Sequence, residues 1–141
     1  MISIQSDDFD QGVEYAALAS GKDTGAVVSF VGRVRDFGDG SLYLDHYPGM
    51  TKKVLEKIIA QAHARWQLHK VRIIHRFGEL AVEDQIVFVG ISASHRKDAF
   101  AACEFIMDFL KTEAPFWKKE RDLWVDAKDS DTDAALRWKK T

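Results

Sequence analysis

Two lysines, Lys111 and Lys118, stand on either side of a proline and an aromatic pair. A helix cannot continue smoothly through Pro115, because proline has no amide hydrogen and disfavours helical geometry in the residue before it. Lys111 is therefore expected at the end of one element and Lys118 just after a forced bend. Phe116 and Trp117 are large enough to pack that bend against a core. Two ammonium groups beside rigid aromatic packing predict a pocket for an anionic substrate, or a lysine that takes part in chemistry.

Two further cationic clusters come from other predicted elements. Arg33 and Arg35 lie where a predicted strand meets a glycine-rich turn. The second cluster, Ser94-His95-Arg96, opens a predicted helix. A helix N-terminus presents free amide groups and the positive end of the helix dipole, so this cluster could hold a phosphate or a carboxylate. A plainer interpretation is a helix capped by Ser94 and followed by two exposed polar residues.

The predicted helix separates two of these clusters. Lys111 lies at its far end, about 24 Å from His95 at a rise of about 1.5 Å per residue. One helix cannot bring both of its ends to one small ligand. Either the ligand is extended, or neighbouring subunits complete each other's sites.

The composition narrows the class of protein. A chain of 141 residues is long enough to bury a core, and we predict a single domain over 1–141. A net charge of −2 argues against a general nucleic-acid binder or a protein of anionic membranes, which are usually basic. Any cationic site must therefore be local.

The cysteine count and the N-terminal segment indicate the compartment. Cys103 is the only cysteine, which excludes an internal disulfide, and we expect it to be a small buried apolar residue. Closely spaced cysteine and histidine ligands are missing from the sequence, so no metal or other cofactor is expected. The N-terminus does not resemble a signal peptide, and no apolar run is long enough to span a bilayer. We expect a cytoplasmic protein.

Hydrophobic periodicity predicts helices mixed with short strands. The almost continuous apolar run at 86–93 is typical of a strand buried on both faces near the centre of a sheet. The predicted helices cover 8–20, 50–66 and 95–111, with a helical turn at 133–138, and the predicted strands cover 25–37, 42–47, 71–77, 86–93 and 123–127. The mixture lacks a strict alternation of strand and helix, which predicts an α+β fold with a mixed, mostly antiparallel sheet packed against helices.

Several familiar sites are missing from the sequence. It has no Walker phosphate loop, no dinucleotide-binding glycine pattern and no serine nucleophile elbow. The histidines lack the spacing of metal ligands. We therefore interpret His46 and His75 as structural strand residues, and His63 and His69 as surface residues near a helix end.

Five sequence blocks, in this order, resemble one known family. They are Phe-Val-Gly-Arg-Val-Arg at 30–35, His-Tyr-Pro-Gly-Met at 46–50, Ile-His-Arg-Phe-Gly-Glu-Leu at 74–80, Ser-His-Arg at 94–96 and Leu-Lys-Thr-Glu-Ala-Pro-Phe-Trp-Lys-Lys-Glu at 110–120. Over roughly 25–127, the chain resembles the large, catalytic subunit of molybdopterin synthase. The block at 46–50 and the lysine segment are the distinctive ones.

The resemblance implies a sulfurtransferase in molybdenum cofactor biosynthesis. Members of this family convert a cyclic pyranopterin monophosphate into molybdopterin by installing a dithiolene. Sulfur arrives as a thiocarboxylate on the C-terminal Gly-Gly tail of a small ubiquitin-like subunit, which enters a pocket of the large subunit. The family forms a heterotetramer around a dimer of large subunits, which would allow sites completed across the two-fold axis.

The resemblance also assigns roles to residues. Lys111 and Lys118 match the essential lysines of the family, and we expect Lys111 to be the principal catalytic group and Lys118 to position the substrate and the tail. A lysine beside a thiocarboxylate could orient it, transfer a proton or bond covalently to the acyl carbon, and the sequence leaves these alternatives open.

The other site residues follow in the same way. Arg35, His95 and Arg96 match the pocket for the anionic substrate, for which arginine supplies charge-assisted hydrogen bonds. Phe116 and Trp117 are candidates to line a groove for the tail.

Two other functions compete with this one. A non-catalytic module that binds an anionic ligand or a ubiquitin-like tail is the main alternative, but binding alone would tolerate arginine in place of the lysine pair. A nucleic-acid-binding module agrees least with the sequence, because the chain is acidic overall and has no long basic run.

Overall fold

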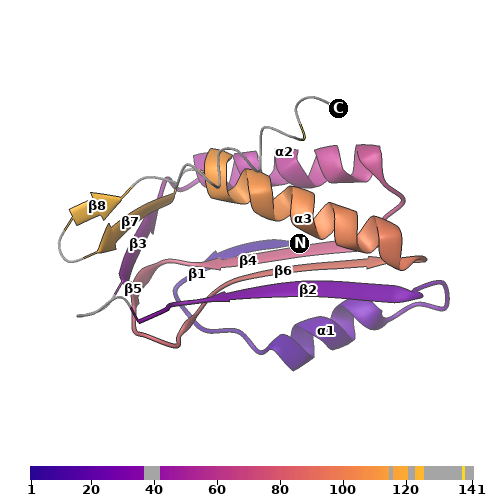
Figure 1. The fold of residues 1–141 in the computed structure, drawn as a ribbon, viewed down its shortest axis with the longest axis horizontal. Helices are drawn as coiled ribbons and strands as arrows, with labels where there is room; N and C mark the ends of the chain where they lie inside the picture. The colour runs from indigo at the N-terminus through magenta and orange to yellow at the C-terminus, as the bar shows by residue number, and fades with distance from the viewer. Residues whose placement is uncertain (37–41, 115, 121–122, 126–137, 139–141) are drawn as a thin grey trace.

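The computed structural model describes residues 1–36, 42–114, 116–120, 123–125 and 138. The elements in chain order are β1 (Ile2–Gln5), α1 (Gln11–Ala19), β2 (Ala26–Arg33), β3 (Leu42–His46), α2 (Met50–Arg65), β4 (Lys70–Arg76), β5 (Gly78–Leu80), β6 (Gln85–Ala93), α3 (Arg96–Glu113), β7 (Phe116–Glu120) and β8 (Leu123–Val125). This arrangement confirms the predicted α+β class (Figure 1).

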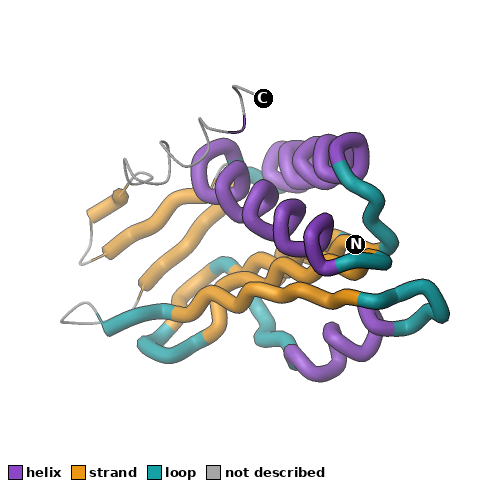
Figure 2. The backbone as a smooth tube through the Cα atoms, turned by 45° about the vertical axis from the view of Figure 1, so that its right-hand side comes forward, coloured by secondary structure: helices purple, strands orange, loops and turns teal. Residues whose placement is uncertain are grey.

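A four-stranded main sheet forms the centre of the molecule. Its strand order is β1-β4-β6-β2, and only the β1–β4 pair is parallel. Helix α1 covers one face of this sheet, while α2 and α3 lie side by side on the other face (Figures 1 and 2). Because β6 is an inner strand covered on both faces, it needs apolar side chains in both directions, and it is buried from Val87 to Ala93. The prediction of a central buried strand is therefore confirmed.

A second, smaller sheet lies at one end of the molecule. Its strand order is β5-β3-β7-β8, and its pairs are antiparallel. It packs around a small apolar cluster that consists of Val34, Leu42, Leu44 and Leu80. The segment that follows Pro115 is thus a strand paired with β3, and not only a bend.

Most of the apolar core lies between the main sheet and the pair α2 and α3. The apolar residues of α3 occupy most of its circumference, as expected of a core helix, and seven of its residues are buried. They are Ala99, Ala102, Cys103, Phe105, Ile106, Phe109 and Leu110. In the part of the chain that the structure describes, no helix has the length and apolarity needed to cross a membrane.

The predicted buried face of the helix at 8–20 is wrong for three of its four residues. The apolar pattern predicts that Phe9, Val13, Ala16 and Ala17 point inward. Phe9 is half-buried against Phe88, but the other three are exposed, and Val13 is 63% exposed. Leu18 is buried instead, in a cluster with Ile74 and Phe88. The helix has nine residues, and Leu18 is its one buried residue.

The remaining predicted elements have mixed outcomes. The helices at 50–66 and 95–111 and the strands at 42–47, 71–77 and 123–127 are confirmed within a few residues. Strands β1, β5 and β7 were not predicted. The turn at 36–41 lies almost wholly outside the described residues, as does the helical turn at 133–138, of which only residue 138 is described.

Trp138 packs into the groove between α2 and α3. Its ring meets Trp66 edge-on at 5.9 Å and Phe105 at 5.6 Å between centroids. Its indole N–H donates to Asp108 Oδ2, and its carbonyl oxygen accepts from Arg65 Nη2 at 3.0 Å. A residue close to the end of the sequence is thus part of the main core.

We expect Trp138→Ala to lower the free energy of unfolding by about 2 kcal/mol, because it removes a large, half-buried ring and leaves Asp108 without its indole partner. Trp138→Phe keeps a ring in the groove and is expected to lose only about 1 kcal/mol. Urea unfolding of the three proteins measures both differences. Equal stability of wild type and Trp138→Ala would show that this packing contributes nothing.

Candidate active site

Three of the predicted site residues lie at the same end of the main sheet. Strand β6 runs away from this end, and α3 runs back toward it, so Lys111 in the last turn of α3 returns to the edge where β2 ends (Figure 1). Arg35 follows the end of β2 and is exposed. Lys118 lies on β7, which joins the small sheet at this same end. The fold therefore places Arg35, Lys111 and the strand that carries Lys118 at one end of the molecule.

The bend between the two lysines is short. Helix α3 ends at Ala114, whose backbone is extended with φ −71° and ψ 128°. The amide of Phe116 donates to the carbonyl of Ala114 at 2.9 Å, and β7 begins directly. Register with β3 places Lys118 opposite Leu44. The expectation of a helix end, a forced bend and a second lysine just beyond it is confirmed.

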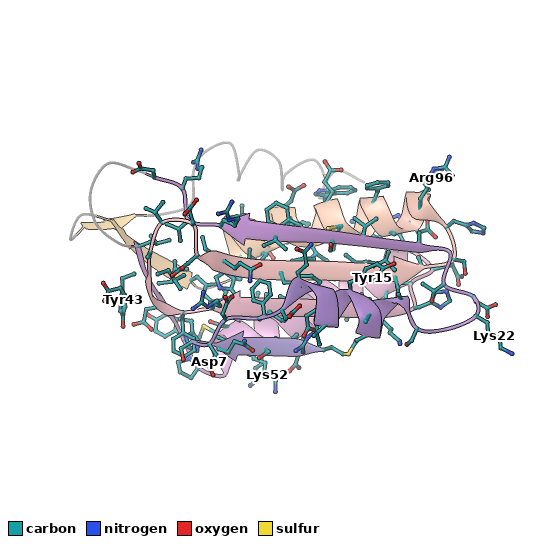
Figure 3. All side chains as sticks on the ribbon, turned by 90° about the horizontal axis from the view of Figure 1, so that it is seen from below. Asp7, Tyr15, Lys22, Tyr43, Lys52 and Arg96 are labelled. Carbon is teal, nitrogen blue, oxygen red and sulfur yellow. The ribbon has the colours of Figure 1, made fainter. Side chains whose placement is uncertain are left out.

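The third predicted cluster lies at the opposite end of α3. His95 is the N-cap residue of this helix, Arg96 is its first residue, and both are exposed. Figure 3 shows Arg96 at the far end of the molecule from Tyr43 on β3, which pairs with β7. Within one protomer, these two residues therefore cannot share a small ligand with Lys111.

The prediction of Ser94 as the N-cap is wrong. The helix begins one residue later, and Ser94 Oγ lies 3.1 Å from His69 Nε2. The side chain of His95 makes no capping hydrogen bond with the described part of α3. The first amides of the helix are therefore not occupied by a serine cap.

Gly25 holds the segment that precedes α3. Its amide donates to the carbonyl of Ala93 at 3.0 Å, and a Cβ atom at this position would lie 2.2 Å from the carbonyl oxygen of Ser94. No side chain can enter so close a backbone contact without displacing it. The position of His95 and Arg96 thus depends on a glycine in the loop before β2.

We expect Gly25→Ala to lower the free energy of unfolding by about 1–3 kcal/mol and to displace the segment at 94–96, because the new methyl group collides with backbone. Gly12→Ala on α1 is the matched control, and its new methyl group would meet only the exposed side chain of Asp10, at 3.2 Å, so a smaller loss of stability is expected. Thermal unfolding measures both. A Gly25→Ala protein as stable as Gly12→Ala would contradict the contact.

Two histidines that we interpret from sequence as structural strand residues lie beside this site. The ring of His75 on β4 stacks on that of Phe116 at 3.7 Å between centroids, with an angle of 16° between the planes. The ring of His46 on β3 lies 4.6 Å from Phe77 and 6.2 Å from Phe116. We call these four side chains, His46, His75, Phe77 and Phe116, the ring cluster. Because His46, His75 and Phe116 are far apart in the sequence, a local sequence pattern could not predict that their rings meet.

The lone cysteine does not belong to the chemistry. Cys103 is buried in the core under α3. Burial, with a smaller effect of nearby Glu104, raises the pKa of its thiol to about 11. A thiol with this pKa stays protonated at neutral pH and is a poor nucleophile. Over the described ranges, no three side chains of histidine, cysteine, aspartate or glutamate gather as metal ligands would.

Comparison with known proteins agrees with this geometry. The model of the family described as "MoaE protein" matches residues 4–113. The molybdopterin synthase catalytic subunit of Vibrio cholerae is 55% identical over 97% of each chain, and that of Escherichia coli is 52% identical over 92% of each chain.

Solved structures give the same result. The MoaE protein of Burkholderia ambifaria superposes with a TM-score of 0.86 and 56% identity, over 98% of this chain and 97% of that one. Molybdopterin synthase of Staphylococcus aureus gives a TM-score of 0.77 and 32% identity, over 88% of this chain and 91% of that one. The resemblance found in the sequence is confirmed, and this chain belongs to the MoaE protein family.

Proposed function

We propose that this chain is the catalytic subunit of a molybdopterin synthase. It transfers sulfur from the C-terminal thiocarboxylate of a small ubiquitin-like subunit to the cyclic pyranopterin monophosphate, and the product carries the dithiolene of molybdopterin. The observation that carries this proposal is the gathering of Arg35, Lys111 and Lys118 at one end of the sheet, in a chain that matches catalytic subunits over nearly its whole length.

The chemistry of the reactants suits these residues. The precursor carries a phosphate and the sulfur donor is a thiocarboxylate, so both are anions. Arg35 supplies fixed donors for the phosphate, and the ammonium group of Lys111 is placed to act on the thiocarboxylate. Lys118, on the strand just past the bend, positions the substrate and the tail. In this scheme Lys111 is the principal catalytic residue.

His95 and Arg96, at the opposite end of α3, would become part of the site if two protomers paired along β2. In the described part of the chain, β2 is an edge strand of the main sheet and offers unpaired backbone groups. Phe30 on β2 is 40% exposed, and Phe100 on α3, which packs over β2, is 61% exposed. Antiparallel pairing about a two-fold axis would bring the Ala26 end of one β2 beside the Arg33 end of the other.

This pairing would overcome the separation of His95 and Arg96 from Lys111 within one protomer. His95 and Arg96 of one protomer would approach Arg35 and Lys111 of its partner, and each site would hold residues of both chains. We therefore propose a homodimer with two sites, each receiving phosphate contacts from the opposite protomer.

The small subunit is the expected second partner. The molybdopterin-converting factor of Helicobacter pylori has been solved as a complex of its subunits 1 and 2. We propose that this chain forms the corresponding heterotetramer, with Phe116 and Trp117 contributing to the groove that receives the tail. A cytoplasmic location belongs to the same proposal, since Cys103 is a free thiol.

A single-turnover assay tests this function. Purified protein is mixed with the cyclic precursor and either the thiocarboxylated small subunit or the same subunit with an ordinary carboxylate. We expect dithiolene product only with the thiocarboxylate. Tight binding of both small subunits without product from either would identify the chain as a binding module instead.

A further inference from the structure

The ring cluster joins the two sheets of the molecule. His75 lies on β4 of the main sheet, whereas His46 and Phe116 face each other in register on β3 and β7 of the small sheet. Phe77 lies between β4 and β5. Three rings from separate strands, and that of Phe77 from the link between β4 and β5, thus meet where the chain leaves α3 and enters β7.

His75 is held in a single orientation within this cluster. It is 6% exposed, and its Nδ1 lies 2.8 Å from the carbonyl oxygen of Arg76. Because a carbonyl only accepts, Nδ1 carries the hydrogen and donates it. This bond fixes the plane of the imidazole, and the ring of Phe116 lies almost parallel to that plane. A hydrocarbon side chain at position 75 could fill the same space but could not fix this plane.

His46 adds an observation that packing alone does not explain. Its Nδ1 is enclosed and has no hydrogen-bond partner among the described residues. Buried polar atoms are nearly always paired, and exceptions concentrate where function constrains the structure. The chain therefore keeps two imidazoles around Phe116 although one of them carries an unpaired buried nitrogen.

The position of Phe116 decides where the second lysine goes. Lys118 follows it by two residues on the same strand, and the bend at Ala114 connects that strand to the helix that carries Lys111. A shift of Phe116 that moves β7 with it would change the separation of the two lysines. Catalysis that depends on such a separation loses roughly 10²-fold from a displacement of about 1 Å.

We propose that His75 is a positioning residue for sulfur transfer. Its hydrogen-bonded imidazole, stacked on Phe116, fixes the strand of Lys118 relative to the helix of Lys111. The role rests on the proposed function, and it acts through Phe116 and not through contact with the substrate.

The kcat and KM of four single variants and one double variant test this role. His75→Leu removes the flat ring, His75→Phe keeps it without the Nδ1 hydrogen bond, and Phe116→Leu removes the other half of the stack. Ile73→Val is the matched control, because Ile73 is buried two residues earlier on the same face of β4 and belongs to the main core. Each protein is also measured for thermal stability and for affinity toward the small subunit.

We expect His75→Leu to lose roughly 10²-fold in kcat with little change in KM or in small-subunit affinity, whereas Ile73→Val keeps its kcat. His75→Phe should recover only part of the loss, because it keeps a flat ring beside Phe116 but lacks the Nδ1 hydrogen bond that fixes the plane of that ring. Phe116→Leu should match the kcat of His75→Leu, and the double variant His75→Leu/Phe116→Leu should be no slower than either, since both act through one stack. If His75→Leu does not fold, the kcat of Phe116→Leu is compared with that of His75→Phe. The proposal predicts the lower kcat for Phe116→Leu, and equal values would contradict it.

Three outcomes would overturn the proposal. The first is a His75→Leu protein with the kcat of Ile73→Val, which would reduce His75 to a packing residue. The second is a double variant whose losses multiply, which would show independent actions. The third is an inactive wild type, which would remove the proposed function and this role together, whereas an active wild type with either of the first two results removes only the role.

Discussion

Lys111→Ala is expected to reduce dithiolene formation by roughly 10³-fold while leaving the fold and the association with the small subunit intact. Lys111 lies exposed in the last turn of α3, outside the buried core. Substitutions at such positions usually change stability by no more than about 0.5 kcal/mol. The loss would therefore fall on chemistry, and single-turnover product formation measures it.

Two variants sharpen this result. Lys97→Ala removes another exposed lysine of α3, at the opposite end of the helix, and should keep wild-type activity. Lys111→Arg keeps the positive charge but cannot release a proton at neutral pH or act as an amine nucleophile. Activity in Lys111→Arg would limit the lysine to electrostatics. Equal activity of Lys111→Ala and Lys97→Ala would remove Lys111 from the reaction.

Two inactive variants are expected to restore each other's activity when mixed. If each site combines Lys111 of one protomer with Arg96 of its partner, a mixed dimer of Lys111→Ala and Arg96→Ala contains one site with both residues intact. Random exchange makes half of the dimers mixed, so activity should return to about a quarter of the wild-type value. Product formation after co-incubation or co-refolding measures this recovery.

The control mixes Lys111→Ala with Lys111→Ala/Arg96→Ala, which contains no intact site in any combination and should stay inactive. Two inactive parents that give no recovery, although mass spectrometry shows mixed dimers, would place Arg96 and Lys111 in the same chain's site. A fully active Arg96→Ala parent would remove Arg96 from the site.

The long periodic elements were predictable because their patterns are local. Helices α2 and α3 have sustained apolar stripes, and the apolar run of β6 indicates a strand with two covered faces. Strand β7 was missed because Lys118, Lys119 and Glu120 are not typical strand residues. Its pairing with β3 depends on contacts across more than half of the sequence, which a local pattern cannot show.

The candidate site was predictable as a set of residues but not as a place. Residue types and the proline bend indicated Lys111 and Lys118, and the family resemblance added Arg35, His95 and Arg96. The sequence could not show that Arg35 and Lys111 share one end of the sheet, because this depends on the directions of β2, β6 and α3.

The ring cluster had a weaker signal in the sequence. His46 and His75 each stand at the end of a predicted strand, and a proline followed by an aromatic residue at 116 indicates a packed bend. Nothing local connects these three positions, since their rings meet only after two sheets have formed.

The origin of the product's sulfur tests the central claim most directly. The small subunit is thiocarboxylated with a heavy sulfur isotope, mixed with this protein and the cyclic precursor, and the dithiolene product is analysed by mass spectrometry. If this chain catalyses the proposed transfer, both sulfur atoms of the product carry the label. Unlabelled product, or labelled thiocarboxylate that stays intact in a stable complex with the wild-type protein, would contradict it.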